Sequence, residues 1–447
     1  MKNVIKIFFV GAVLSILNVQ AETIKSEDYT FNLKATRDGS EYKQGEEVEF
    51  LLKATKNGQP VEVQLSGKFT KDSVDLGQNF SGSTKDGKFS VKSSLNEAGF
   101  LRCEMYVKFP AKDGKTKGVF MLANAGIDVL KIKPSLPTPK DFDKFWAKQK
   151  KILASIPMNV QMRKVNSDPE IEAFDVQADS FNGKLSAFIA YPKGAQPKSL
   201  PAIVLPHGAG VYASTIPTRW AKQGFLAINF NANGLPNNKP QKFYTDLARG
   251  ELKQYYLKNC QDKETIFFRT LYMRLMRAMD VVCAQPQWDG KNLVVCGGSQ
   301  GGGQAIAAGG LNPKVTAVVA GFPAICDHSG CVIGRTTGWP HFTRLDENGK
   351  YDEKAVEAAR YIDGVNFASR IKGKAFFLIN YADNVCEPTS CYAAYNNVKA
   401  PKVLRVNEEA RHTPTVGSYP ALQNLMIEYL QQRGANVKLR TDLTSTY

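Results

Sequence analysis

Histidine, cysteine and long apolar stretches are all scarce in this sequence of 447 residues. Eight cysteines are too few for a disulfide scaffold in a chain of this length, and no Cys-x-x-Cys or His/Cys spacing indicates a zinc site. The net charge of +16 is spread without any block of about five like charges, and no nucleic-acid-binding motif accompanies it. Partners of the nucleic-acid class are therefore not expected.

The first 21 residues have the features of a secretory signal peptide. Lys2 and Lys6 flank a short n-region, residues 7–17 are apolar, and residues 19–21 give an Ala-x-Ala-like cleavage site. No cysteine stands at that site to carry a lipid, and no later apolar run is long enough to span a bilayer. We therefore expect an exported protein, periplasmic or secreted, without stable membrane insertion.

Export allows disulfides to form. Cys326 and Cys331, and likewise Cys386 and Cys391, are close enough in sequence to pair. Buried free thiols are the alternative, and the sequence leaves both open.

Residues 22–128 alternate between polar and apolar side chains in short runs. Asp-Gly and Asn-Gly turn signals separate these runs, at 38–39, 57–58, 86–87 and 113–114. This pattern predicts an all-β, immunoglobulin-like sandwich of about 100 residues. The segment contains no histidine and no catalytic set, so we interpret it as a spacer or a binding module.

Residues 129–447 have the pattern of an α/β catalytic domain. Three prolines, at 134, 137 and 139, mark its boundary, and an amphipathic helix follows from Phe142. Beyond about residue 170, short apolar runs alternate with helical stretches, as expected for strands buried on both faces of a parallel sheet. The expected strands are 202–205, 225–230, 293–296, 315–320, 375–379 and 403–406, and the expected helices include 262–285 and 420–433.

Residues 297–301, Gly-Gly-Ser-Gln-Gly, form a Gly-x-Ser-x-Gly motif between an apolar run and a stretch of small helical residues. This context predicts a nucleophile elbow, a strained turn that exposes the hydroxyl of Ser299. A bystander serine in a glycine-rich turn is the alternative. A serine hydroxyl becomes a good nucleophile only when a neighbouring base takes its proton, so the hypothesis requires a histidine.

Asp383 and His412 complete the expected catalytic set. Each follows an apolar run, at the end where parallel strands meet one edge of the sheet, and the chain order Ser, Asp, His is the order of elbow hydrolases. Two alternatives remain. His328 or His341, in an expected lid insertion, would serve as the base, or Asp383 would cap a helix that starts near residue 388.

The segment Leu205 to Gly210 follows an expected strand, as the oxyanion loop of such hydrolases does. We assign the oxyanion hole to the backbone N–H groups of Ala209 and Gln300. His207 is interpreted as a residue that structures this loop. The mechanism requires no metal and no cofactor.

Several motifs then stand in register along the chain, at 141–146, 264–269, 298–303, 322–327, 383–388 and 393–396. They resemble the acetyl xylan esterases and cephalosporin C deacetylases of carbohydrate esterase family seven. The resemblance covers about 125–435 and not the predicted sandwich. It implies an α/β-hydrolase fold with Ser299 as nucleophile, Asp383 as acid and His412 as base. It also implies a homo-oligomer such as a hexameric ring, which an added N-terminal domain would block or alter.

The sequence departs from the family at three places. Residues 233–235, Asn-Gly-Leu, replace the family's Arg-Gly-Gln; His412 is followed by Thr413 and not by Glu; and Ala209 replaces the bulky Tyr of the oxyanion loop. An N–H group survives a side-chain change, so catalysis is expected to persist. The loss of the Tyr side chain predicts a wider acyl pocket.

These observations predict an exported serine esterase that removes acetyl or other short acyl groups through an acyl-enzyme on Ser299. The expected substrates are polysaccharide or oligosaccharide esters such as acetylated xylan. One alternative is a carboxylesterase of broader specificity that acts on small hydrophobic esters. The other is a non-catalytic glycan-binding protein on the hydrolase scaffold.

Overall fold

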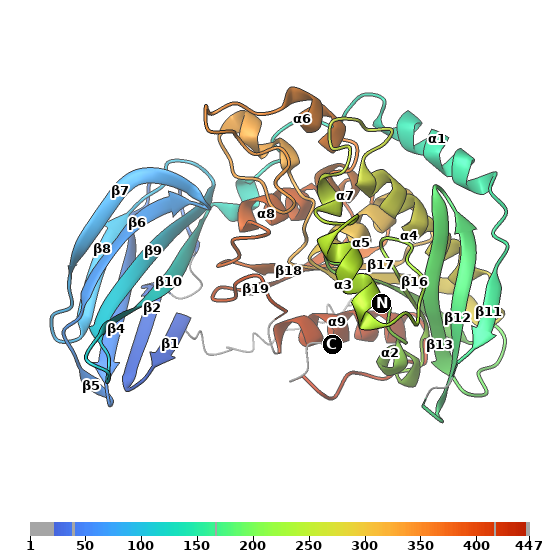
Figure 1. The fold of residues 1–447 in the computed structure, drawn as a ribbon, viewed down its shortest axis with the longest axis horizontal. Helices are drawn as coiled ribbons and strands as arrows, with labels where there is room; N and C mark the ends of the chain where they lie inside the picture. Colours follow the sequence, from blue (N-terminus) through green and yellow to red (C-terminus); the bar gives the residue numbers. More distant parts are fainter. Residues whose placement is uncertain (1–21, 38–40, 166–167, 415–416, 444–447) are drawn as a thin grey trace, which may run out of the picture.

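The computed structural model describes residues 22–37, 41–165, 168–414 and 417–443. The predicted signal peptide, residues 1–21, lies outside the described residues. Figure 1 shows an all-β region (residues 22–127, blue to teal) beside a larger α/β region (residues 128–443, teal to red). Among the described helices, none combines the length and the apolar character that a membrane span requires.

The all-β region contains two sheets that enclose one core. Its strands are β1 (Glu22–Ser26), β2 (Tyr29–Ala35), β3 (Glu41–Tyr42), β4 (Val48–Lys56), β5 (Gln59–Pro60), β6 (Gln64–Lys71), β7 (Val74–Ser83), β8 (Lys88–Ser93), β9 (Gly99–Pro110) and β10 (Thr116–Ile127). One sheet has the order β1-β2-β4-β5, with β8 on β4, and the other has the order β3-β10-β9-β6-β7. Phe31 and Phe50 from the first sheet and Met105 and Met121 from the second are fully buried in the shared core. Buried and more exposed side chains alternate along β2 and along most of β4, as the polar and apolar pattern of the sequence predicts.

A nine-stranded mixed sheet crosses the α/β region. Its strands are β11 (Gln161–Lys164), β12 (Ile171–Ser180), β13 (Gly183–Pro192), β14 (Leu200–Pro206), β15 (Leu226–Phe230), β16 (Trp288–Gly298), β17 (Ala317–Gly321), β18 (Lys374–Asn380) and β19 (Lys402–Asn407). The spatial order is β11-β12-β13-β15-β14-β16-β17-β18-β19. The strands from β15 to β19 pair in parallel, whereas β11, β12 and β13 form an antiparallel edge.

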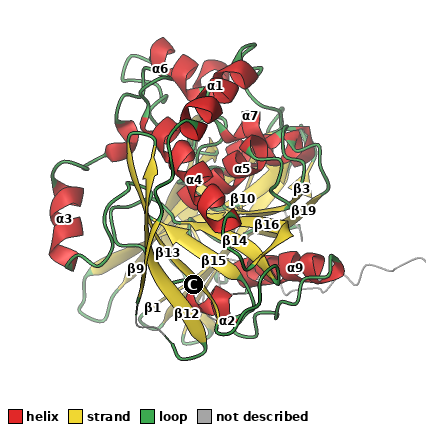
Figure 2. Cartoon of the chain, turned by 90° about the vertical axis from the view of Figure 1, so that its right-hand side faces the viewer, coloured by secondary structure: helices red, strands yellow, loops and turns green. Residues whose placement is uncertain are grey.

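Helices cover both faces of this sheet (Figure 2). They are α1 (Phe142–Ala154), α2 (Thr218–Lys222), α3 (Gln241–Arg249), α4 (Phe267–Cys283), α5 (Gln300–Leu311), α6 (Glu353–Ala359), α7 (Gly364–Ala368), α8 (Pro388–Asn397) and α9 (Ser418–Gln432). Neighbouring residues of β14 show the two faces: Val204 packs in the core with α1, α4, α5, α7 and α8, and Ile203 packs in the core with α2 and α9. Because both faces are buried, the central strands are continuously apolar.

The predicted α/β class and the all-β region are confirmed. Each expected strand of the parallel sheet is present, and the helices expected at 262–285 and 420–433 are α4 and α9, with α4 shorter at both ends. The antiparallel edge and the helices α2, α3, α6 and α7 were not predicted from the sequence. Strands β16, β18, β19 and β14 end at the same edge of the sheet, so the segments that follow them meet there.

We predict that Leu422→Ala lowers the free energy of unfolding by about 2–5 kcal/mol, because Leu422 on α9 is fully buried against the sheet and its truncation leaves a cavity. Leu130→Ala is the matched control, since Leu130 is 70% exposed, and it should change the same quantity by less than about 0.5 kcal/mol. Urea denaturation followed by fluorescence measures both. Equal effects of the two substitutions would contradict this packing.

Candidate active site

Ser299 occupies the sharp turn between β16 and α5, with φ 55° and ψ −124°. This backbone conformation is strained for a residue other than glycine. Hydrogen bonds to the next strand hold it: the Ser299 N–H donates to Gly321 O at 3.0 Å, and Ser299 O accepts from the Ala324 N–H at 3.0 Å. The turn therefore presents the Ser299 side chain at the carboxyl edge of the sheet.

Glycine at position 301 allows α5 to approach this edge closely. A Cβ atom at Gly301 would lie 2.3 Å from the backbone oxygen of Pro206, and a Cβ atom at Gly297 would lie 2.6 Å from the backbone of Gly301. A side chain at Gly301 would push α5 away from the end of β14, and one at Gly297 would push it away from β16. The glycines of the motif are thus explained by backbone packing.

Ser299, His412 and Asp383 form one chain of hydrogen bonds. His412 Nε2 lies 2.9 Å from Ser299 Oγ, and His412 Nδ1 lies 2.8 Å from Asp383 Oδ2. The Asp383 side chain is buried, and its Oδ1 accepts hydrogen bonds from the N–H groups of Val385 and Cys386 at 2.8 and 2.9 Å. The arrangement orients the imidazole with one nitrogen on the carboxylate and the other on the serine.

The structure does not place Asp383 as a helix cap, nor His328 or His341 beside Ser299. Glu387, not Asp383, occupies the N-cap position of α8. His328, in the 3₁₀ helix η3 (His328–Ile333), is fully buried and stacks on Phe342, with ring centroids 4.8 Å apart. Neither His328 nor His341 lines the pocket that contains Ser299.

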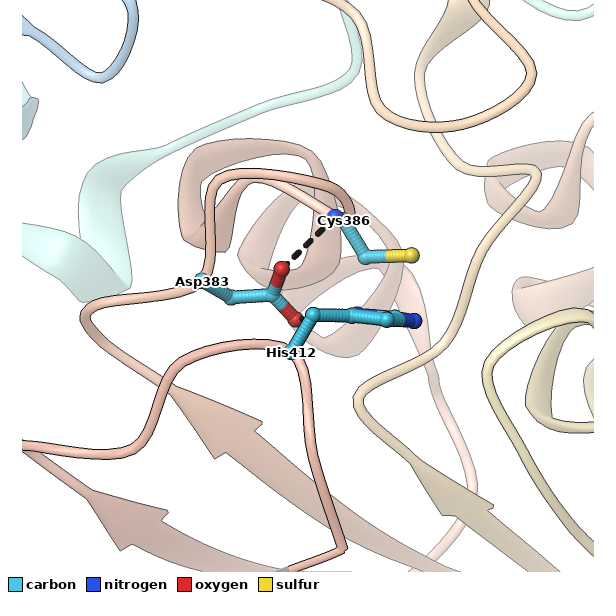
Figure 3. A group of neighbouring side chains, drawn as sticks. All are labelled: Asp383, Cys386 and His412. Carbon is cyan, nitrogen blue, oxygen red and sulfur yellow. Dashed lines mark hydrogen bonds and ion pairs between the residues drawn. The ribbon is translucent and has the colours of Figure 1, made fainter.

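Cys386 lies beside Asp383 and His412 (Figure 3), and one ligand atom of each residue falls within 4.8 Å of the others. A metal would need the Cys386 thiolate and a free imidazole nitrogen. Burial raises the pKa of the Cys386 thiol well above its usual value, so the thiol keeps its proton. Both nitrogens of His412 are engaged by Asp383 and Ser299. Asp383, Cys386 and His412 are therefore poorly suited to bind a metal, and His412 is instead placed for proton transfer between Ser299 and its own imidazole.

The two N–H groups assigned to the oxyanion hole lie on segments that one tyrosine links. Tyr255 accepts a hydrogen bond from the Gly210 N–H at 2.9 Å and donates to Gln300 Oε1 at 2.9 Å. Ala209 lines the Ser299 pocket, and Gln300 begins α5, where a helical N–H has no partner within the helix. Sequence analysis missed Tyr255, because no motif surrounds it.

His207 structures the loop that follows β14. Its Nδ1 bonds to Gly208 O at 2.6 Å, and its Nε2 accepts from the Ala232 N–H at 3.0 Å. Burial lowers the pKa of His207 to about 4, so the ring is neutral near pH 7. Asn233, the first residue of the Asn-Gly-Leu segment that replaces the family's Arg-Gly-Gln, contacts the same loop: its Nδ2 donates to Gly210 O at 3.3 Å.

All eight cysteines are free thiols in the structure. The four that were candidates for disulfides are buried. Two of their sulfurs contact backbone oxygens: Cys391 Sγ lies 3.3 Å from Pro323 O, and Cys326 Sγ lies 3.4 Å from Ala324 O. Of the two states that the sequence left open, disulfides or buried free thiols, the structure has the buried free thiols.

A cavity of about 940 Å³ opens beside Ser299 and His412. Its walls come mainly from apolar and aromatic side chains, among them Trp220, Phe322 and Trp339. Phe322 also packs edge-on against the His412 ring, with centroids 5.4 Å apart. Such a cavity can accept the apolar part of an ester beside the nucleophile.

A mixed sheet with a nucleophile elbow at its carboxyl edge defines the α/β-hydrolase class. Solved relatives have this fold, so the predicted fold class is confirmed. The protein is a carboxylic-ester hydrolase of this class.

The chain belongs to the acetyl xylan esterase family, as the resemblance implied. The sequence profile of that family, acetyl xylan esterase (AXE1), matches residues 125–432. The acetyl esterase Axe7A of Xylanibacter ruminicola is 30% identical over 392 residues, which cover 84% of this chain and 84% of that protein.

Two solved structures have a similar fold. The acetyl xylan esterase from Paenibacillus sp. R4 is 28% identical, with a TM-score of 0.59 over 68% of this chain and 98% of that chain. Acetyl xylan esterase 1 from Thermoanaerobacterium sp. JW/SL YS485 is 22% identical, with a TM-score of 0.57 over 68% of this chain and 97% of that chain.

The buried imidazole of His328 predicts a pH-dependent stability. Its ring nitrogens have no hydrogen-bond partner within the part of the chain that the structure describes, and burial lowers its pKa to about 3. Below the ordinary histidine pKa the unfolded chain binds a proton that the folded protein does not. The free energy of unfolding therefore decreases as the pH is lowered below the ordinary histidine pKa of about 6.5, by about 1.4 kcal/mol per pH unit for this group.

We expect His328→Phe to remove this contribution, because the aromatic ring keeps its stacking on Phe342 without a titratable group. Urea unfolding at pH 7.5 and at pH 5.0 measures the loss of stability, which should be smaller in the variant by about 2 kcal/mol. Groups that titrate in the opposite direction are common to both proteins and cancel in this comparison. An identical loss in the two proteins would refute the assignment.

Proposed function

We propose that the protein is an exported serine esterase that removes acetyl or other short acyl groups from polysaccharide or oligosaccharide esters such as acetylated xylan. The observation that carries the mechanism is the 2.9 Å contact between His412 Nε2 and Ser299 Oγ. The names of the similar proteins support the acetyl ester, and the features of residues 1–21 support export.

In the proposed mechanism, His412 Nε2 takes the proton of Ser299 as Oγ attacks the ester carbonyl. The N–H groups of Ala209 and Gln300 bind the oxyanion, and Asp383 stabilises the imidazolium. His412 then gives its proton to the leaving alcohol, and an acyl-enzyme remains on Ser299. Water attacks this ester with His412 again as the base, which releases the acid and restores the serine.

Ser299→Ala should lower kcat for p-nitrophenyl acetate and for acetylated xylo-oligosaccharide by about 10⁵-fold or more, because no other nucleophile replaces the hydroxyl. Ser155→Ala, at the end of α1, is the matched control and should keep full activity. A fluorophosphonate should label the mature protein and the control but not Ser299→Ala. Equal turnover by Ser299→Ala would disprove the mechanism, and a folded protein that neither turns over esters nor is labelled would favour a glycan-binding protein.

The size of the cavity favours a second candidate, a carboxylesterase of broader specificity. A volume of about 940 Å³ exceeds what an acetyl group fills, and Ala209, where the family has Tyr, lies on the wall of the cavity. A longer acyl chain would cover apolar side chains there, at about 0.8 kcal/mol per buried CH₂.

A comparison of p-nitrophenyl acetate, butyrate and octanoate distinguishes the two candidates. If the cavity takes the acyl group, kcat/KM should rise from acetate to butyrate, and Ala209→Tyr should reverse this order by about tenfold because its ring fills the space. The substituted residue keeps its backbone N–H, so acetate turnover should survive. A preference for acetate in the unmodified protein would support the deacetylase and assign the cavity to the alcohol side of the ester.

A further inference from the structure

The all-β region reaches the candidate active site through Arg102 on β9. We propose that Arg102 is a positioning residue that holds the carboxylate of Asp383 in line with His412; this inference rests on the serine-esterase mechanism proposed above. The Arg102 side chain is 1% exposed. Its Nη2 donates to the backbone carbonyl of Asp383 at 2.9 Å and to the carboxylate of Glu387 at 2.8 Å.

Both contacts are made to the loop between β18 and α8, residues 381–387, with Glu387 at its end. Within the loop, Asp383 Oδ1 accepts from the N–H groups of Val385 and Cys386, which leaves Oδ2 for His412. Such local bonds fix the shape of the loop. The end of β18 is joined to the segment that carries His412, because Asn380 Nδ2 donates to Arg411 O at 2.9 Å and to Thr413 O at 3.0 Å. Arg102 adds an anchor from the all-β region that holds the backbone of Asp383 itself.

The direction of the guanidinium is itself fixed by the all-β region. Arg102 Nε donates to Asn124 Oδ1 on β10 at 3.0 Å, and Nη1 donates to Ser73 Oγ, in the turn between β6 and β7, at 3.3 Å. Ser73 Oγ also donates to Glu387 Oε1. Because the guanidinium is planar, holding Nε and Nη1 determines where Nη2 points.

The ion pair between Arg102 and Glu387 is buried, so we expect it to orient the Asp383 loop more than to raise the free energy of unfolding. Both side chains are 1% exposed, and a buried pair loses much of its attraction to desolvation while it strongly restricts orientation. Burial raises the pKa of Glu387 to about 7, and the Arg102 charge opposes this shift. Asp72, also buried, faces the same guanidinium.

Packing beside Arg102 makes the anchor rigid. Phe100, two residues earlier on the same face of β9, belongs to the core of the α/β region and not to the core of the sandwich. Its ring contacts Tyr381, directly after β18, and Tyr392 on α8, with centroids 4.7 and 5.7 Å apart. β9 therefore contacts the chain before Asp383, through Phe100 on Tyr381, and after it, through Arg102 on Glu387.

The test compares Arg102→Lys with Arg277→Lys in the full chain. Lysine keeps a positive charge for Glu387 but cannot also bind the Asp383 carbonyl and Asn124. We expect kcat for p-nitrophenyl acetate to fall by about 10- to 100-fold with KM unchanged, as expected for a displaced acid. Arg277 is a matched control: it is buried, and its Nη2 donates to two backbone carbonyls, of Leu153 and Ile156, each at 2.8 Å. Arg277→Lys should lose thermal stability and keep kcat.

A second variant covers the case in which Arg102→Lys does not fold. Asn124→Ala removes only the bond that directs Nε, and it should lower kcat by about 3- to 10-fold with KM unchanged. The rate constant for fluorophosphonate labelling of Ser299 should fall in parallel in each folded variant, because it reports the activation of the serine directly. A loss of Tm with normal kcat and normal labelling would overturn the inference.

Failure of this inference and failure of the proposed function give different results. If the unmodified protein hydrolyses esters and the Arg102 and Asn124 variants match it, only the inference is wrong. If the unmodified protein is labelled without ester turnover, the labelling rates of the variants still decide the role of Arg102. If it is neither labelled nor active, both proposals are wrong.

Discussion

The α/β region is organised around one backbone conformation, the positive φ of Ser299. A serine has little tendency to adopt it, so the neighbouring segments must hold it in place. Gly321 and Ala324 do so from the adjacent strand end, and the missing side chain of Gly301 lets α5 close on the segment after β14. The parallel order of the strands then brings Asp383 and His412 to the same edge, where their hydrogen bonds reach Ser299.

The parts of the structure that follow from local pattern could be predicted from the sequence. Strand β14 and its neighbours are continuously apolar because both faces are buried, and this signal is strong. Ser299 is found from a motif in which glycines, an apolar strand and a small-residue helix agree. For Asp383 and His412, chain order and strand ends were enough to propose residues that the fold brings together.

The parts that depend on contacts between distant segments could not be predicted. Tyr255 connects the oxyanion loop to α5 through its hydroxyl, and nothing in its own neighbourhood distinguishes it from an ordinary core tyrosine. Arg102 lies 281 positions from the Asp383 carbonyl that it binds. The antiparallel edge was missed because β11 and β12 lack the apolar runs typical of the centre of the sheet, although β13 contains one at residues 187–191.

The packing of Phe100 also blurs the boundary between the two regions. The sequence divides near residue 128, yet this ring lies in the larger core, between Tyr381 and Tyr392. Removal of the N-terminal strands would leave a cavity in that core and an unpaired Glu387 beside it. We therefore expect the two regions to unfold together in a single calorimetric transition. An unrelated sandwich could not replace the N-terminal region without redesign of the surface that receives Phe100 and Arg102.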